Sequence, residues 1–274
     1  MLPALLAAFA YAALASAMPR AGGSYIYASR GLSPYLGFIA SFSQWFGLSI
    51  VIGVIAYIIV PFIRDVFIGL EWIQAAELME VPLIRIAIAL GLIWLFVYIN
   101  IRGGKFYERT VVPLMFVMFG LGIIVIISGF VFDQQAYANA VPESAAYNNQ
   151  EKPEFDPIVF LSAAAILFSS FIGFDAIAQA GGEAKNPNRN LPKAILLAIS
   201  IVGSFYFLYT IAMYNTVPWG YVADQAQLKD ITAPGLITPL LPVGLSVAIL
   251  FGAAIALIND LPAMLLSVSR LVFA

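Results

Sequence analysis

The sequence has 274 residues, of which 62% are hydrophobic and 10% are charged, and its formal net charge is −2. Soluble domains are nearer to half apolar and a quarter charged, so this composition indicates an integral membrane protein, and the weak charge gives no support for a nucleic-acid partner. Histidine and cysteine are absent, which excludes disulfides, thiolate nucleophiles, Cys/His zinc sites and imidazole catalysis. We therefore expect a membrane protein that is not an enzyme and has no metal site or cofactor.

Apolar segments of membrane length dominate the chain. A helix needs about 20 apolar residues to cross the hydrocarbon core, and seven segments come close to or exceed that length. In chain order they are Leu2–Met18, Tyr35–Ile63, Leu83–Ile101, Val111–Phe132, Pro157–Gly181, Leu191–Val217 and Leu236–Val272. The sequence thus predicts an all-α integral membrane fold with seven transmembrane helices and no soluble domain. The last segment exceeds the width of a bilayer, so it should be tilted or extend into water.

Basic residues are distributed unequally between the connecting segments. Nine of the 13 lysines and arginines fall in one alternating set of loops and span ends, from Arg20 to Arg270. Cytoplasmic loops are enriched in lysine and arginine, so we expect this set to be cytoplasmic, with Met1 outside and Ala274 inside the cell membrane. The other set is acidic and includes the longest polar stretch, Asp133–Asp156, for which a solvated external connection is expected.

One segment combines a glycine and an acid at membrane depth. Pro157–Gly181 contains Gly173-Phe174-Asp175. An ionised carboxylate in the hydrocarbon core is costly, and glycine there loosens a backbone that lipid forces to be fully hydrogen-bonded. This pattern predicts a helix broken near Gly173 and a site for an amine, a cation or a proton at Asp175. A structural carboxylate that accepts neighbouring backbone N–H groups is the alternative.

Polar side chains in two other segments are further candidates. Asn259 and Asp260 precede Pro262, and proline removes a helical hydrogen bond and disturbs the preceding turn. They are candidates for an ion or coupling site, and polar contacts between helices are the alternative. The segment Tyr35–Ile63 carries a set of polar side chains: Ser41, Gln44 and Trp45 at helical spacing, with Ser43 and Ser49 nearby. These side chains either pack against other helices or line a pathway, and both interpretations stay open.

Four stretches of the sequence resemble the amino acid–polyamine–organocation (APC) superfamily of secondary transporters. They are Met18–Tyr27, with its Arg20-Ala-Gly-Gly-Ser24 core; Asn100–Lys105; Ser170–Asp175 followed by Gly182–Pro192; and Ser269-Arg270. By this resemblance they are the loops after the second and fourth helices, the sixth helix with its exit loop, and the end of the eighth helix. The resemblance implies that residues 1–274 are a partial permease domain, corresponding to helices two to eight of a twelve-helix, five-plus-five inverted-repeat fold whose first helix and helices nine to twelve are absent.

The resemblance also implies a function, secondary active transport of amino acids by alternating access, coupled to H⁺ or Na⁺. Its partners are an amino acid substrate and the lipid bilayer. The implied substrate contacts lie at the sixth-helix break: Phe171, Ile172, Gly173, Phe174 and Asp175. The implied coupling or ion residues are Asp175, Asn259 and Asp260. Val111–Phe132 holds no lysine where some proton-coupled members carry one, so the coupling ion is open. A polyamine or organocation carrier and an incomplete, non-transporting chain are the alternatives.

Overall fold

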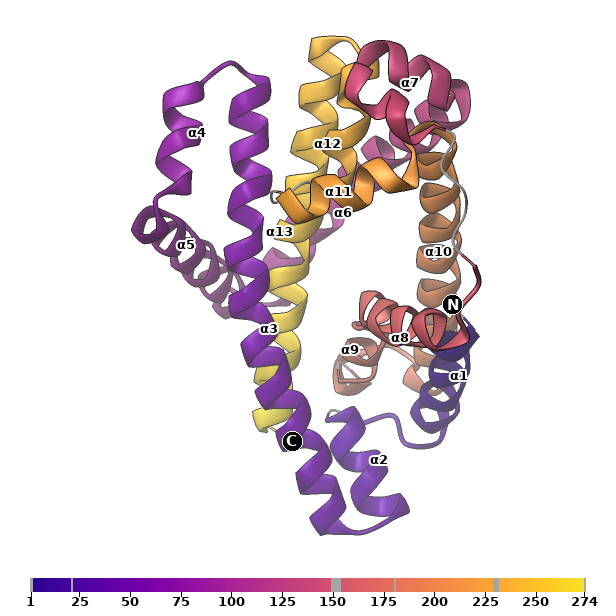
Figure 1. Ribbon diagram of the computed structural model, residues 1–274. Coiled ribbons are helices and arrows are strands. Elements are labelled where there is room, and N and C mark those ends of the chain that lie inside the picture. Colours follow the sequence, from indigo (N-terminus) through magenta and orange to yellow (C-terminus); the bar gives the residue numbers. More distant parts are fainter. Residues whose placement is uncertain (1, 21, 149–153, 180, 229–231, 274) are drawn as a thin grey trace. The chain divides into compact units, whose positions relative to one another are not determined.

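The computed structural model describes residues 2–20, 22–148, 154–179, 181–228 and 232–273, and within these ranges its elements are α-helices (α) and short 3-10 helices (η), with no strand (Figure 1). In chain order they are α1 (Leu2–Ala17), α2 (Gly23–Gly31), α3 (Pro34–Gly69), α4 (Ile73–Glu80), α5 (Pro82–Ile101), α6 (Gly104–Val131), α7 (Gln134–Ala140), η1 (Pro142–Tyr147), α8 (Pro157–Phe168), η2 (Ser169–Phe171), α9 (Phe174–Gln179), η3 (Gly181–Glu183), α10 (Pro187–Thr216), α11 (Trp219–Leu228), α12 (Ala233–Ile237), η4 (Thr238–Leu240) and α13 (Val243–Phe273).

The predicted all-α membrane architecture is confirmed by the length and composition of the helices. Among the described residues, six helical segments are long and apolar enough to cross a membrane: Pro34–Gly69, Pro82–Ile101, Phe106–Val131, Pro157–Gln179, Pro187–Thr216 and Val243–Val272. The first predicted span differs, because α1 is an apolar helix of only 16 residues. At 1.5 Å per residue it is about 24 Å long, shorter than the roughly 30 Å hydrocarbon core.

The last predicted span, Leu236–Val272, is wrong at its beginning. Leu236 belongs to α12, and the chain then passes through η4 to Leu241, which is extended with φ −115° and ψ 151°. Pro239 and Pro242 interrupt this stretch, and proline supplies no N–H for a continuing helix. The long helix therefore begins only at Val243, and residues that look like membrane span by hydropathy form a short folded connection instead.

The predicted solvated connection Asp133–Asp156 is also wrong in part. Residues 134–147 form α7 and η1, and the Asp133 carboxylate caps α7 by accepting from the backbone N of Ala136 at 2.8 Å. The side chain of Tyr137 is 1% exposed, and Ser144 is fully buried. This part of the connection is therefore a packed element. Residues 149–153 lie outside the described residues.

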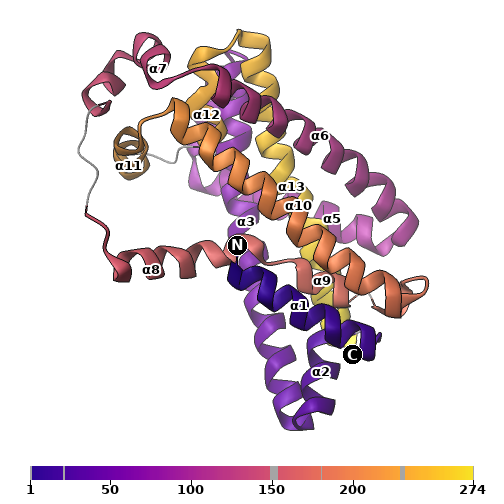
Figure 2. The ribbon, with the colours of Figure 1, turned by 90° about the vertical axis from the view of Figure 1, so that its right-hand side faces the viewer.

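The chain divides into two compact units. The first unit comprises Met1–Ile52, Pro153–Tyr206 and Ala263–Ala274, and the second comprises Gly53–Lys152 and Phe207–Pro262. In the first unit, α1 presents a stripe of small buried residues to α9 and to α10 (Figure 2): Ala4, Ala8, Ala12 and Ala15. Residues three and four apart share one helix face, and small side chains there allow helices in a membrane to approach closely.

Close backbone packing also organises the second unit. A Cβ added to Gly129 of α6 would lie 2.5 Å from the carbonyl oxygen of Ala212 in α10. At the same place, the carbonyl oxygen of Gly129 accepts from Thr216 Oγ1 at 2.9 Å and from Asn215 Nδ2 at 3.0 Å. Helix contacts made through small residues and interhelical hydrogen bonds are typical of membrane proteins.

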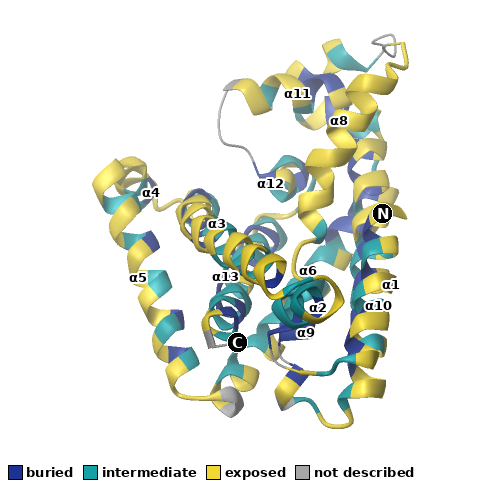
Figure 3. Cartoon of the chain, turned by 90° about the horizontal axis from the view of Figure 1, so that it is seen from below, coloured by how far each residue is buried: buried dark blue, intermediate teal, exposed yellow. Residues whose placement is uncertain are grey.

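Large apolar side chains cover the outer faces of the helices. Along α5, exposed and buried residues alternate with the helical turn (Figure 3), so that Leu83 and Trp94 are exposed whereas Ala89 and Phe96 are buried. A soluble monomer rarely exposes apolar surface on this scale, whereas lipid covers it at no cost. Burial and helix length together therefore identify a multi-pass membrane protein.

Candidate functional site

The membrane-length segment Pro157–Gln179 is interrupted where the sequence predicts a break. α8 ends at Phe168, η2 adds one 3-10 turn, and α9 begins at Phe174. Between them, Ile172 is extended with φ −60° and ψ 135°, and Gly173 has φ +127°, which residues with a Cβ rarely adopt. The predicted break near Gly173 is confirmed. The requirement for glycine is conformational, because a Cβ at this position would meet no atom within 4 Å.

The break leaves two backbone acceptors without a partner. Ile172 N donates to Ser169 O at 3.1 Å, and Ala176 N donates to Gly173 O at 3.0 Å. No backbone N–H of the described residues donates to the carbonyl groups of Phe171 or Ile172. Non-helical backbone at membrane depth is tolerated where it is buried in protein or lines a cavity. These two carbonyl groups are therefore the acceptors that the break offers to a donor such as an ammonium group.

Asp175 is tied to both the break and a neighbouring helix. Its Oδ1 accepts from the backbone N of Gly173 at 3.1 Å, and its Oδ2 accepts from Gln44 Nε2 of α3. The side chain is half-buried. The first contact satisfies a backbone N–H that the break releases, which supports the structural interpretation of the carboxylate. The second contact places Asp175 in a larger polar arrangement.

A continuous series of hydrogen bonds, here called the polar chain, extends from Asp175 into the first unit. Gln179 Nε2 of α9 donates to Gln44 Oε1 at 3.1 Å and to Ser24 Oγ of α2 at 3.5 Å. The Ser24 hydroxyl lies 2.9 Å from the hydroxyl of Tyr11 in α1. The polar chain thus comprises Asp175, Gln44, Gln179, Ser24 and Tyr11, and it connects four helices of one unit.

Gln179 is the most deeply buried member of the polar chain, with 1% of its surface exposed. A Cβ at Gly23 would lie 3.2 Å from its Cδ and Oε1, so glycine permits α2 to approach α9 this closely. Among the described residues, neither Gln179 Oε1 nor the nearby buried hydroxyl of Tyr27 has a hydrogen-bond partner. Buried polar atoms of this kind are usually paired with ordered water or a bound group.

Aromatic side chains on both sides of the break pack against other helices. The ring of Phe171 makes an edge-to-face contact with Tyr206 of α10, with centroids 5.5 Å apart. The ring of Phe174 makes an edge-to-face contact with Tyr11 of α1, also at 5.5 Å. The predicted contacts Phe171, Ile172, Gly173, Phe174 and Asp175 are therefore brought together as one segment, but their role in substrate binding stays a prediction.

Asn259 and Asp260 lie in α13, within the second unit. The carbonyl oxygen of Pro262, two residues further on, accepts from Asn100 Nδ2 of α5 at 3.3 Å. Asn259 Oδ1 is buried and has no hydrogen-bond partner among the described residues, whereas Asp260 is exposed. A polar contact between helices is thus present at the proline, and the coupling role of Asn259 and Asp260 stays a prediction.

Sequence reasoning overlooked three members of the polar chain, Gln179, Ser24 and Tyr11. The available signal was spacing, because Gln179 follows Asp175 by four residues and lies on the same helix face. Gln44 was open to two interpretations, and the structure shows a polar contact between helices. Ser41, by contrast, bonds only within its own helix, to the carbonyl oxygen of Phe38 at 3.1 Å.

The fold and the break define a multi-pass membrane protein with a polar site at an interrupted helix. The profile of the amino acid permease family matches residues 1–274, and the chain belongs to this family. This confirms the resemblance to the APC superfamily that the four sequence stretches indicate.

Comparison with curated proteins gives the same class. The chain is 25% identical over 235 residues to the cadaverine/lysine antiporter of Escherichia coli, which covers 84% of this chain and 48% of that protein. It is 25% identical over 270 residues to uncharacterized transporters of Mycobacterium bovis and Mycobacterium tuberculosis, which covers 97% of this chain and 54% of each relative. The chain therefore spans about half the length of the curated relatives it matches. These relatives are transporters and not enzymes, as the sequence predicts for this chain.

Proposed function

We propose that this chain forms part of a secondary transporter that carries amino acids across the cell membrane by alternating access, and that the helix break receives the ammonium group of the substrate. The observation that carries the proposal is the pair of unpaired carbonyl groups at Phe171 and Ile172, adjacent to the carboxylate of Asp175. Carbonyl oxygens and a carboxylate are the acceptors that an ammonium group requires.

The electrostatics of Asp175 give the proposal a mechanism. Asp175 already accepts from Gly173 N and from Gln44, and an arriving ammonium group would compete with the neutral amide of Gln44 for the same oxygen. A hydrogen bond between two ionised groups is roughly twice as strong as a neutral one, so the substrate would displace Gln44. Substrate binding would thereby reorganise the polar chain. Coupling to H⁺ or Na⁺ would act through Asp175, with Asn259 and Asp260 as further candidates.

A diamine or polyamine is the second candidate cargo. The Escherichia coli relative is named for cadaverine and lysine, and both compounds carry a primary ammonium group on an alkyl chain. The acceptors at the break recognise that group and do not require a carboxylate on the substrate. The same site geometry therefore supports amine cargo as well as amino acid cargo.

Uptake by proteoliposomes containing the purified chain tests the proposal. Labelled lysine, leucine and 1,5-diaminopentane are each supplied with a proton gradient, with a sodium gradient, or with neither. We expect Asp175→Asn to reduce uptake about tenfold or more, because a bond to a charged partner is lost, and to flatten the dependence of uptake on pH. The matched control is Asp156→Asn, since Asp156 caps α8 and asparagine caps a helix equally well.

Two outcomes would contradict the proposal. If Asp175→Asn leaves both uptake and its pH dependence at the level of the unmodified chain, Asp175 does not act in binding or coupling. If the unmodified chain binds these compounds but moves none of them under any gradient, the non-transporting alternative holds. The orientation of the reconstituted chain is measured in parallel by protease access to the loops, with the end at Met1 expected outside.

A further inference from the structure

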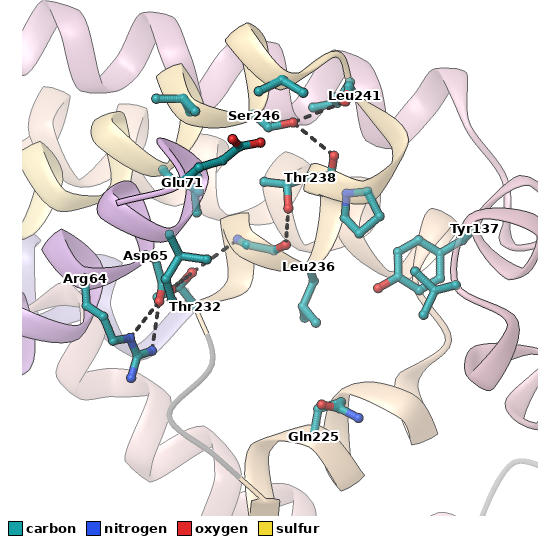
Figure 4. Close-up of a pocket in the computed structure, with 18 of the residues that line it drawn as sticks. Arg64, Asp65, Glu71, Tyr137, Gln225, Thr232, Leu236, Thr238, Leu241 and Ser246 are labelled. Atoms are coloured by element: carbon teal, nitrogen blue, oxygen red, sulfur yellow. Dashed lines mark hydrogen bonds and ion pairs between the residues drawn. The ribbon is translucent and has the colours of Figure 1, made fainter. Parts of the chain in front are cut away.

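The second unit contains a cavity that is separate from the helix break. Its volume is about 970 Å³, and it lies between the end of α3 and the elements α7, α11, α12, η4 and α13 (Figure 4). Cavities of roughly 300–1,000 Å³ are typical of small-molecule sites. The loops that line it belong to the set with few basic residues, which the sequence places on the external side.

The charged groups of the cavity leave it negative. Three carboxylates, Asp65, Glu71 and Glu80, line it together with a single guanidinium, that of Arg64. Arg64 pairs with Asp65 at 2.8 Å and with Glu80, and Thr232 Oγ1 donates to Asp65 Oδ2 at 3.2 Å. These contacts occupy two of the carboxylates. Glu71 is exposed and makes no hydrogen bond or ion pair with any side chain in the described part of the chain.

Glu71 holds its position at a conformational cost. It has φ +62°, and it follows α3 where Trp72 N donates to Phe67 O at 2.9 Å and Glu71 N donates to Ile68 O at 3.0 Å. This is the Schellman ending of a helix, in which the left-handed residue is usually glycine. The helix dipole also places partial negative charge here. A glutamate at this position is therefore unfavourable for folding on two grounds, and a bound cation would offset the second.

The side chain of Tyr137 supplies a second, independent indication of a ligand. Tyr137 is 1% exposed, and its hydroxyl points into the cavity (Figure 4). It has no hydrogen-bond partner among the described residues. Its ring packs edge-to-face on Tyr221, with centroids 6.0 Å apart, so the same wall offers aromatic surface. Burial raises the pKa of Tyr137, which keeps the hydroxyl neutral.

We propose that this cavity binds a small organic cation with a primary ammonium group on a short alkyl chain. The ammonium group pairs with Glu71, and the alkyl chain lies against Tyr221 and Leu236. In a diamine, the second ammonium group donates to the hydroxyl of Tyr137. A metal ion fits less well, because no three acidic side chains of the described residues converge closely enough to hold one. The site lies wholly in the second unit, so it does not depend on the proposed role of Asp175.

Equilibrium dialysis of the purified chain in lipid nanodiscs tests this site. The probes are labelled n-pentylamine and 1,5-diaminopentane, and the neutral competitor is 1-pentanol. We expect saturable binding of both amines that Glu71→Gln weakens about tenfold. Tyr137→Phe should weaken the binding of 1,5-diaminopentane roughly threefold to tenfold and leave n-pentylamine unchanged, because only the diamine has a second polar group for that hydroxyl. The matched control is Glu77→Gln, because Glu77 of α4 is exposed like Glu71 but does not line the cavity.

Two further variants distinguish binding in this cavity from misfolding and from binding at the helix break. Glu71→Gly should lose amine binding while the chain becomes more stable to unfolding, because glycine removes the backbone strain; a merely misfolded variant would lose both. Asp175→Asn should bind these amines at the cavity as the unmodified chain does. The proposal is overturned if binding is not saturable, if Glu71→Gln and Tyr137→Phe bind 1,5-diaminopentane normally, if Glu77→Gln weakens binding equally, or if 1-pentanol competes as well as the amines.

Discussion

Replacing Gly173 by alanine tests whether the helix break is set by backbone conformation. Gly173 has φ +127°, which an L-residue with a Cβ rarely adopts. No heavy atom lies within 4 Å of a Cβ built at this position, so a steric clash with neighbours does not contribute. The whole effect of Gly173→Ala must therefore come from the backbone, and strained conformations of this type cost about 1–3 kcal/mol each.

Gly91 provides the matched control. It lies within α5, and a Cβ at this position also meets no atom within 4 Å. In a helix interior, alanine is favoured over glycine by about 1 kcal/mol, so Gly91→Ala should be neutral or stabilising. The same chemical change should therefore have opposite signs at the two positions, with a difference in unfolding free energy of about 2–4 kcal/mol.

The difference is measured by titrating each purified variant in mixed micelles with sodium dodecyl sulfate and following helicity by circular dichroism. A Gly173→Ala variant that is as stable as Gly91→Ala would refute the reasoning, since it would show that a residue with a Cβ adopts the backbone conformation of position 173 without strain. A Gly173→Ala variant that is destabilised but binds substrate normally would separate the conformation of the break from its proposed function.

Three other substitutions give expected outcomes. Gln44→Leu removes the donor to Asp175 and should lower the unfolding free energy by about 1–3 kcal/mol, measured by the same titration. Gly129→Ala places a Cβ 2.5 Å from a backbone oxygen and should cost about 3 kcal/mol or more. The hydroxyl of Tyr147 donates to Asp224, and this bond raises the pKa of Tyr147. Ultraviolet titration should show that pKa falling toward its ordinary value in Asp224→Asn.

The first two of these predictions each have a control variant, and the third predicts the direction of a pH effect. Ser49→Ala, on the same helix as Gln44, should change stability by less than about 0.5 kcal/mol, because its hydroxyl bonds only to its own helix. Gly120→Ala, on the same helix as Gly129, has open space around its Cβ and should be neutral or stabilising. The raised pKa of Tyr147 means that its contact stabilises the fold fully below the unfolded pKa of about 10 and is lost as pH rises through the folded pKa. A loss of that contribution as the pH falls from about 9 to about 6 would contradict this sign.

Hydropathy and a single local pattern were enough to predict the architecture and the break. Helices in lipid must satisfy their own backbone, so apolar length alone locates them, and Gly173-Phe174-Asp175 stands out because it violates that rule. The first predicted span, Leu2–Met18, agrees with α1 to within one residue, although that helix is shorter than a membrane span. Leu236 was assigned to the last span although proline residues separate it from α13. Hydropathy gives the preference of a side chain for apolar surroundings and does not show where the backbone turns.

The details of the site could not be predicted because they depend on which faces meet. Gln179 looks like one polar residue near a span end, and its burial follows only from the approach of α2 at Gly23. The alanines of α1, from Ala4 to Ala15, look like ordinary apolar sequence, although their spacing marks the packed face. Tyr137 lies in a stretch that composition indicates is solvated, and only tertiary packing buries it.

The two halves of the interrupted helix differ in how firmly they are held. α9 is bound through Asp175 and Gln179 to the polar chain, whereas α8 has no buried residue. If α8 rotates relative to α9, the change in backbone conformation falls at Ile172 and Gly173, where the chain is not helical. A change in the angle of α8 would alter the exposure of the two open carbonyl groups and would move Gly173 N, which donates to Asp175 Oδ1, while the contact between Asp175 and Gln44 stays within α9 and α3.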